Sequence, residues 1–192
     1  MQARLAVVSL IAALGLVGAS VALAAVITGT NGDDTLRGTA AADVIRGLDG
    51  NDRIAGRGGG DVVFAGAGND TVRGGRGADT IWGNAGEDEL YGAGGGDIVR
   101  GRGGNDEVRG GGGPDQLFAG FGADEVHGGY GGDRLHAVAK DGELDTLNCG
   151  PGRDVAVIRA GEPTALVNCE QVNVVADDPS STEEPGESPS DD

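Results

Sequence analysis

Aspartate recurs every nine residues through the centre of this chain, twelve times without an interruption. Two positions after each of these aspartates stands an aliphatic residue, and two positions before it stands Gly in every copy except the one with Ala41. Five positions before it stands Gly again, replaced only by Ala65 and Ala119. The chain is built on the unit G-x-x-G-x-D-x-U-x, in which U is aliphatic and the aspartates are Asp34, Asp43, Asp52, Asp61, Asp70, Asp79, Asp88, Asp97, Asp106, Asp115, Asp124 and Asp133.

Each unit divides into a loop half and a strand half. The two glycines indicate backbone with positive φ or a close approach to another loop. The last three residues, such as Thr71-Val72-Arg73, predict a short extended piece whose middle side chain points inward. One buried aliphatic group cannot hold such a strand alone, so the units must stack and share a continuous core. The repeat predicts an all-β solenoid, and the presence of only six prolines argues against collagen.

Residues 74–82, Gly-Gly-Arg-Gly-Ala-Asp-Thr-Ile-Trp, resemble the RTX (haemolysin-type) calcium-binding nonapeptide G-G-x-G-x-D-x-U-x. The resemblance covers residues 29–136 and implies a right-handed parallel β-roll with two nonapeptides per turn and two short parallel sheets. It also implies that Ca²⁺ ions lie between successive loops along each edge. The twelve aspartates, Asp34 through Asp133, are then the predicted metal ligands.

The residues themselves support an 18-residue turn and a calcium ligand set. The residue before the repeat aspartate is mostly polar in odd units, as in Asn51 and Asn69, and mostly Gly or Ala in even units. Calcium prefers six to eight oxygen ligands, and glycine loops offer unshielded carbonyls beside each carboxylate. Six loops on each edge would hold at most about ten ions. The alternative is a metal-free solenoid in which Asp and Asn merely favour turns.

The chain also departs from the family pattern. The second Gly of the motif is replaced in seven copies, by Thr in the first two, Thr30 and Thr39. A β-branched residue at positive φ would be an outlier, so these two loops are expected to be looser and to bind weakly. Family members commonly carry a C-terminal export signal, whereas this chain has an N-terminal one.

The two ends of the chain differ from the repeats. Residues 1–25 read as a secretory signal peptide cleaved after Ala24 or Ala25, with an uncleaved membrane anchor as the alternative. Residues 26–136 form the predicted roll, and residues 137–176 are predicted to be degenerate repeats and a cap. Residues 177–192 contain seven acids and three prolines, which predicts a disordered acidic tail.

The segment after the last regular repeat has its own features. The frame slips by three residues after Leu135, and Asp145 and Asp154 are again nine apart, which marks degenerate units. Cys149 and Cys169 are expected to pair because the chain is exported. The pattern around them is similar to the C-terminal cap of secreted actinobacterial RTX-like proteins. The cap's apolar pieces would be residues 155–158, 165–167 and 172–175.

Charge and residue inventory exclude several functions. A net charge of −17 would repel a nucleic-acid backbone and favours cations as partners. Residues 26–176 contain no serine, one lysine and two histidines, so a nucleophile with a supporting base is hard to assemble. His127 and His136 are expected on opposite sheets as plain surface residues. We therefore expect no enzyme activity.

The predicted function is that of a secreted, extracellular calcium-binding protein that folds on binding Ca²⁺. An alternative is a calcium-dependent adhesion module for a surface polysaccharide or protein, acting through the even-sheet face that carries Phe64, Trp82 and Phe118. That face could equally receive the chain's own cap, or its aromatics could simply fill the outer pleat of the sheet. A remoter alternative is a non-catalytic module related to RTX-bearing extracellular enzymes. No membrane association is expected after signal cleavage.

Overall fold

The computed structural model describes residues 7–10 and 23–176, and all regular structure in these residues is β-strand. The strands are β1 (Val7–Leu10), β2 (Ala25–Thr28), β3 (Thr35–Arg37), β4 (Val44–Asp49), β5 (Arg53–Gly58), β6 (Val62–Ala67), β7 (Thr71–Arg76), β8 (Thr80–Ala85), β9 (Glu89–Gly94), β10 (Ile98–Gly103), β11 (Glu107–Gly112), β12 (Gln116–Phe121), β13 (Glu125–Tyr130), β14 (Arg134–Ala137), β15 (Asp145–Asn148), β16 (Val155–Arg159), β17 (Thr164–Val167) and β18 (Gln171–Val175).

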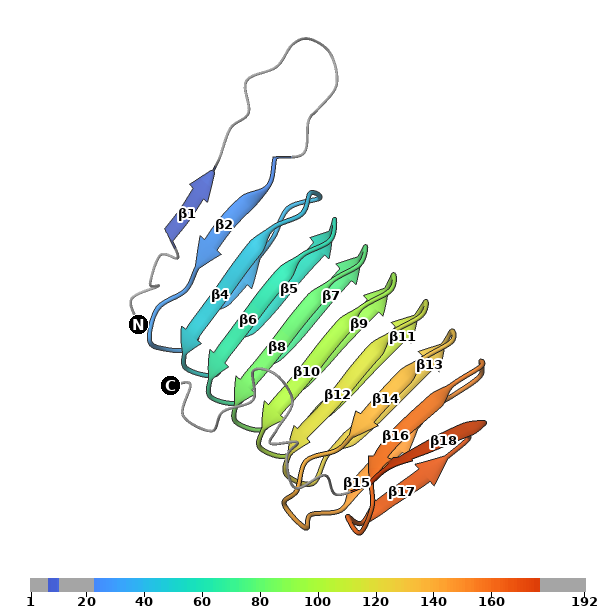
Figure 1. The fold of residues 1–192 in the computed structure, drawn as a ribbon. Helices are drawn as coiled ribbons and strands as arrows, with labels where there is room; N and C mark the ends of the chain where they lie inside the picture. Colours follow the sequence, from blue (N-terminus) through green and yellow to red (C-terminus); the bar gives the residue numbers. More distant parts are fainter. Residues whose placement is uncertain (1–6, 11–22, 177–192) are drawn as a thin grey trace.

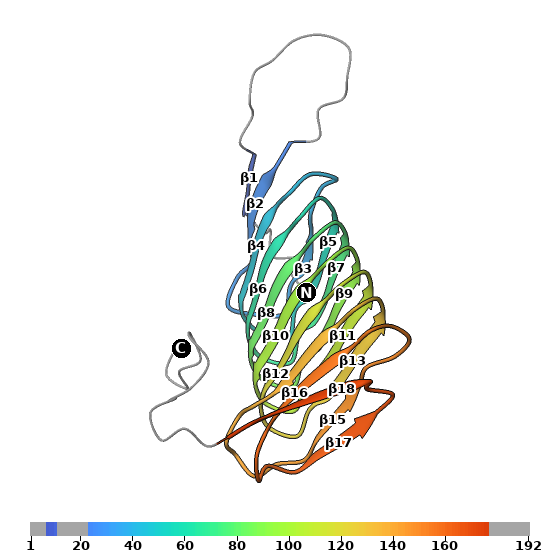
Figure 2. The same cartoon turned by 45° about the vertical axis from the view of Figure 1, so that its right-hand side comes forward.

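Successive strands alternate between two sheets, and the chain winds as a solenoid (Figures 1 and 2). One sheet, here called the even sheet, has the order β1-β2-β4-β6-β8-β10-β12-β14-β16-β18. The other, the odd sheet, has the order β17-β15-β13-β11-β9-β7-β5-β3. Every pairing from β2 onward is parallel and joins residues 18 apart in the regular region, as in Val63↔Ile81 and Val72↔Leu90. The prediction of a parallel all-β solenoid with two nonapeptides per turn is confirmed.

The core is a column of aliphatic side chains, one from each repeat. Val63, Ile81 and Val99 are fully buried and stack in register in the even sheet. The residue two positions later also faces inward, where Ala65 and Ala119 are fully buried in the two copies that lack Gly. The narrow space between the two sheets therefore holds one aliphatic residue and one small residue per repeat.

The strands are longer than the three residues that the sequence predicted. Most of them span six residues, as in β8, because the pairing continues through the first glycine of the next unit. In β8 and β10 the register includes Asn84↔Arg102 and Ala85↔Gly103. Backbone groups in the loop half thus pair with the neighbouring coil, a contact that arises only when coils are stacked.

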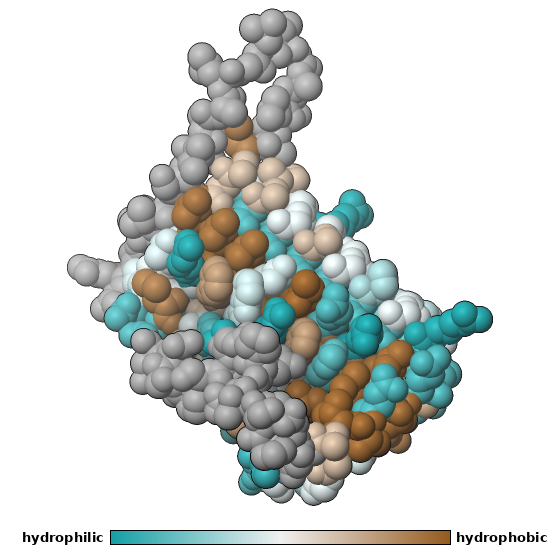
Figure 3. Space-filling view, viewed as in Figure 1, coloured by the Kyte–Doolittle hydropathy of each residue, from teal (hydrophilic) through white to brown (hydrophobic). Residues whose placement is uncertain are grey.

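Residues 137–176 extend the solenoid. β16 and β18 pair edge to edge with the even sheet, and β15 and β17 with the odd sheet. In the last coil the apolar residues remain exposed, Leu166 at 36%, Val172 at 42% and Val174 at 60%. A brown patch lies at the C-terminal end of the solenoid in Figure 3, near β16 and β18. The predicted degenerate repeats thus form further coils, and the role of this segment as a cap stays a prediction.

The first coil pairs with a strand from the predicted signal segment. β1 is antiparallel to β2, with Val8 opposite Ile27. The rest of residues 1–22, and with it the predicted signal peptide as a whole, lies outside the described residues, as does the predicted acidic tail. Within residues 7–10 and 23–176 the structure contains no helix of the length and hydropathy that a membrane crossing requires.

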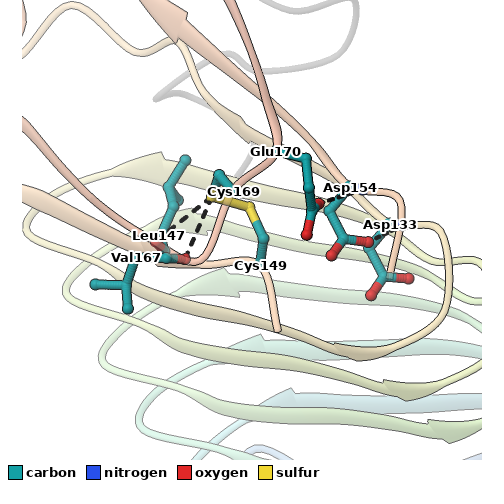
Figure 4. Close-up of a disulfide and its surroundings, with 7 residues drawn as sticks. All are labelled: Asp133, Leu147, Cys149, Asp154, Val167, Cys169 and Glu170. Atoms are coloured by element: carbon teal, nitrogen blue, oxygen red, sulfur yellow. Dashed lines mark hydrogen bonds between the residues drawn. A yellow bond between two sulfur atoms is a disulfide. The ribbon is translucent and has the colours of Figure 1, made fainter. Parts of the chain in front are cut away.

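The predicted disulfide between Cys149 and Cys169 is present and joins two successive coils (Figure 4). Cys149 follows β15 and is fully buried, and Cys169 lies between β17 and β18. The crosslink spans 20 residues, for which chain entropy predicts about 3 kcal/mol of stabilisation.

We expect the double variant Cys149→Ala/Cys169→Ala to lose about that amount of unfolding free energy in saturating calcium. Denaturant titration followed by circular dichroism measures it. Wild-type protein treated with a reductant is the matched control and should lose the same amount. A variant as stable as the oxidised wild type would contradict the prediction.

Candidate metal sites at the loop edges

The repeat aspartates form two buried columns, one along each edge of the solenoid. Each side chain is at most 8% exposed. In each column the Oδ1 atom of one aspartate accepts a hydrogen bond from the backbone N–H of the aspartate one coil earlier, as from Asp70 to Asp88 at 2.8 Å and from Asp79 to Asp97 at 2.8 Å. All twelve predicted site residues take part in these columns, so the structure brings them together edge by edge and not into one cluster.

The second carboxylate oxygen has no hydrogen-bond donor in most of the repeats. It is buried and accepts no hydrogen bond in Asp52, Asp61, Asp70, Asp79, Asp88, Asp97, Asp106, Asp115, Asp133 and Asp154. A buried anionic oxygen without a donor costs more than an ordinary unmade hydrogen bond. Each of these oxygens therefore needs a proton or a cation.

Loop conformation explains which oxygens are left without a donor. The residue four positions before each of those aspartates has a positive φ, as in Gly75 before Asp79 and Ala93 before Asp97. Non-glycine residues adopt this conformation at Leu48, Arg57, Asn84, Ala93 and Arg102. The second motif glycine can thus be replaced without changing the loop, although each replacement carries strain.

The first motif glycine cannot be replaced so freely. A Cβ placed on Gly92 would lie 2.8 Å from the carbonyl oxygen of Gly110 in the next coil and would also meet Oδ2 of Asp97. Gly74 has the same surroundings, with the carbonyl of Gly92 at 2.9 Å and Oδ2 of Asp79. The space beside the glycine is therefore bordered by two oxygens from adjacent coils.

Burial raises the pKa of these carboxyl groups in the metal-free chain. Desolvation is the main cause, and the carboxylate one coil away adds to it, while the hydrogen bond from that coil's backbone opposes it. The pKa reaches about 6 in Asp61, Asp70 and Asp79, about 7 in Asp88 and Asp115, and about 9 in Asp106. At neutral pH the columns are therefore poised between a protonated state and a state that requires cations.

In the first two repeats the aspartate carboxylates accept hydrogen bonds from a threonine, which the later repeats lack. The backbone N–H and the hydroxyl of Thr30 both donate to Oδ2 of Asp34, at 2.5 and 2.9 Å. The N–H of Thr39 donates to Oδ2 of Asp43 at 2.5 Å, and its hydroxyl to Oδ1 at 3.0 Å. Neither threonine has a positive φ. Donors from the protein take the place that is left open in the later loops.

Two further aspartates belong to the columns but were not among the predicted site residues. Oδ1 of Asp145 accepts from the N–H of Asp124 at 3.0 Å, and Oδ1 of Asp154 accepts from the N–H of Asp133 at 2.9 Å. The sequence signal was present, since both aspartates keep the nine-residue spacing and the aliphatic residue two positions on. The 21-residue step that restores their register is visible only in the fold.

Asparagines of the odd edge bind the neighbouring loop and so stabilise it. Oδ1 of Asn51 accepts from the N–H of Asn69 at 2.7 Å, and Oδ1 of Asn69 accepts from the N–H of Glu87 at 3.0 Å. Asn105 does the same for the N–H of Ala123. The even edge has Ala, Gly or Pro at these positions, so the chemical difference between the edges concerns loop-to-loop hydrogen bonds.

The two histidines lie in opposite sheets, as predicted, in β13 and β14. His127 pairs with Glu125 at 2.8 Å. His136 is not a plain surface residue, because its ring stacks on Phe118 with 4.5 Å between centroids. Among residues 7–10 and 23–176 no three His, Cys, Asp or Glu side chains gather as a metal cluster.

Strain at the second motif position gives a stability prediction. Ala93 has φ 90° and is flanked in its sheet column by Gly75 and Gly111, both also at positive φ. We expect Ala93→Gly to raise the unfolding free energy by about 1 kcal/mol, because glycine adopts this conformation without a steric cost. Ala85→Gly is the control and should lower it by about 0.5–1 kcal/mol. Calorimetric melting in calcium measures both, and a destabilised Ala93→Gly would refute the strain argument.

The regular repeats match a known protein family. The family model described as the RTX calcium-binding nonapeptide repeat, with four copies per match, matches residues 28–63, 64–99 and 100–135. These three consecutive matches cover more than half of the chain and coincide with the regular repeats. A search of curated proteins found no match to the chain.

Proposed function

Because the chain belongs to the family of RTX calcium-binding nonapeptide-repeat proteins, we propose that it is a secreted protein whose coils fold around Ca²⁺ ions held between successive loops. One observation carries the proposal. The buried Oδ2 atoms of most regular repeats have no protein donor, and motif glycines such as Gly74 and Gly92 border both such an oxygen and a carbonyl oxygen of the next coil. A hard divalent cation is the partner that such an oxygen set favours.

The proposed ligands follow the columns. Asp52, Asp61, Asp70, Asp79, Asp88, Asp97, Asp106, Asp115 and Asp133 supply an open carboxylate oxygen, and Asp154 adds one in the degenerate region. Carbonyl oxygens of the motif glycines complete each site. When bound, calcium supplies the positive charge that lets these carboxylates stay ionised in a buried place. Asp124 shares the same hydrogen-bond column and is proposed as a ligand with them.

We propose that Asp34 and Asp43 contribute weakly, in agreement with the expectation for the first two loops. Thr30 and Thr39 already donate to their carboxylates, so a cation there would have to displace two donors. These repeats then act as a metal-independent start for the stack. The solenoid is proposed to be a structural module without catalysis.

The experiment compares two aspartates of the same edge. Asp79→Asn removes a charge at an open site, and Asp43→Asn removes one at a site closed by Thr39. Asparagine keeps the acceptor for the neighbouring N–H in both. Calorimetric calcium titration should show a lower stoichiometry for Asp79→Asn and an unchanged one for Asp43→Asn. Equal losses would remove the distinction between open and closed sites, and unchanged binding in both would overturn the proposed ligands.

We do not favour adhesion to a neutral sugar as the function of the even-sheet face. Phe64 and Trp82 stack face to face, with centroids 4.6 Å apart and an interplanar angle of 4°. Arg46 covers Phe64, and Arg100 lies over both Trp82 and Phe118. The ring faces that would lie flat on a sugar are thereby covered by other side chains of the same face.

A further inference from the structure

Six side chains, one per coil, form a continuous stack along the outer surface of the even sheet. We call it the even-face ladder; it consists of Arg46, Phe64, Trp82, Arg100, Phe118 and His136. Its contacts are the Phe64–Trp82 stack at 4.6 Å, the Phe118–His136 stack at 4.5 Å, and guanidinium groups 4.6 to 5.7 Å from the ring centroids. The stacked side chains have their flat faces against one another, so their edges point outward from the sheet.

The ladder lies on a sheet with few carboxylates in a strongly acidic protein; the exposed Asp49 at the end of β4 is one of them. On every even-numbered strand from β2 to β18 the two residues that flank the inward aliphatic position are uncharged or basic, and Arg134 adds a third guanidinium beside Arg46 and Arg100. The corresponding positions of the odd sheet mix both charges, with Glu89, Glu107 and Glu125 beside Arg37, Arg53, Arg73 and Arg109. Within residues 44–157, the basic side chains of the even-sheet face therefore lie along a line that runs with the solenoid.

The edges of the rungs favour anions. An aromatic ring has a negative face and a positive edge, and the faces here are covered by stacking. A guanidinium carries N–H donors around its edge and no acceptor. Burial lowers the pKa of His136 to about 4, with Arg134 and Arg100 adding to the effect, so His136 is neutral at pH 7 and the guanidinium groups supply the charge of the ladder. A carboxylate-rich, extended chain is the ligand that fits this line.

We propose that the acidic segment 177–192 of the same chain docks along the even-face ladder. The segment starts directly after β18 and Ala176, and β18 is the last strand of the even sheet. It carries seven carboxylates, Asp177, Asp178, Glu183, Glu184, Glu187, Asp191 and Asp192, and no basic residue. Because it is tethered to the sheet, its effective concentration at the ladder is of millimolar order.

The lengths are compatible. Seven strand spacings separate β18 from β4 in the even sheet, which is ~34 Å at about 4.8 Å each. Sixteen residues, 177–192, span up to ~50 Å when extended. The segment can therefore reach every rung from His136 back to Arg46 without displacing a strand. Docking would withhold the even face from other polyanions until they compete for it.

The fluorescence of Trp82 reports on docking directly, because Trp82 is the only tryptophan of the chain. The test uses the full-length protein in saturating calcium, and circular dichroism verifies the folded state separately. In the tail-neutral variant each of the seven carboxylates of residues 177–192 is changed to its amide. We expect acrylamide to quench Trp82 about twofold more strongly in this variant than in wild type at low salt, since docking shields the ring and salt screening is weak. In about 1 M NaCl, where the Debye length is ~3 Å, the two proteins should become equal.

A matched pair of arginines tests the ladder itself. Arg100→Gln should abolish the response of the Trp82 indole N–H resonance to salt, whereas Arg109→Gln, over Tyr91 on the odd sheet, should preserve it. Identical quenching of wild-type and tail-neutral protein at low salt would overturn the proposal. So would a Trp82 shift that depends on protein concentration, which would assign the face to a second copy. If polygalacturonate shifts the indole resonance equally in wild-type and tail-neutral protein, the occupant is an external polyanion and the proposal fails.

Discussion

Chelation of calcium at pH 7.5 is expected to abolish the far-UV β-sheet signal of this protein. Without cations the carboxylates of each column lie one coil apart, and the open Oδ2 atoms remain buried without a donor. Each such oxygen costs about 1–3 kcal/mol, so the ten together cost about 10–30 kcal/mol, which is at least comparable with the net stability of about 5–15 kcal/mol that is typical of a domain. One aliphatic side chain per nine residues offers little burial in compensation, so the metal-free chain should be largely disordered.

Circular dichroism in excess chelator, followed by calcium titration, measures the effect. The transition should be cooperative, because a bound ion joins two coils, with midpoints of roughly 10⁻⁴ to 10⁻³ M calcium, as in extracellular modules. Magnesium is the control and should restore far less structure, since it demands octahedral geometry and keeps its waters. A full β signal in chelator would contradict both this prediction and the proposed function.

Acidification of the metal-free protein is expected to restore part of the β structure that chelation removes. The pKa of several column aspartates is raised by burial from about 3.8 to between about 6 and about 9 in the folded chain. A raised folded-state pKa means that the folded state binds more protons than the unfolded state above pH 4. The stabilisation is therefore fully present below about pH 4 and is lost as the pH rises through about 6 to 9.

In chelator the β signal should thus be larger at pH 4 than at pH 8, the reverse of ordinary acid denaturation. In calcium the dependence has the opposite sign, because protons compete with the cation for the same oxygens, and affinity should fall as the pH drops through 7 and 6. Asp106→Asn provides the comparison, since it removes the group with the highest of these pKa values. A metal-free chain that stays equally disordered at pH 4 and pH 8 would disprove the assignment of these pKa shifts.

Much of the site was predictable because the repeat is strictly local in sequence. The spacing of Asp52, Asp61 and Asp70 identified the carboxylates, and their neighbouring glycines identified loops open to a cation. The Thr30 and Thr39 loops were expected to be looser and to bind weakly; both threonines lack the positive φ of the later loops, and weak binding stays a prediction. The reason became clear only with the hydrogen bonds, in which the threonine donors occupy the carboxylates.

Other features depended on distances between coils that spacing does not give. Asp145 and Asp154 enter the columns through 21-residue steps, so a fixed period missed them. The apolar segments expected in the cap continue both sheets, because an apolar strand finds backbone partners on an open edge, and their role as a cap stays a prediction. Sequence alone did not predict the sheet pairing of Val172 and Leu166.

The sequence by itself determined the fold class, the 18-residue turn, the disulfide and the identity of the repeat carboxylates, because each follows from a short period or from a count of cysteines. Tertiary structure decided which carboxylate oxygens stay open and which side chains stack on the even face. Both depend on the alignment of residues 18 apart in the chain, where a positive φ at Gly75 or a ring at Trp82 acts on the next coil. Contacts between coils are fixed by register, and register exists only once the coils have stacked.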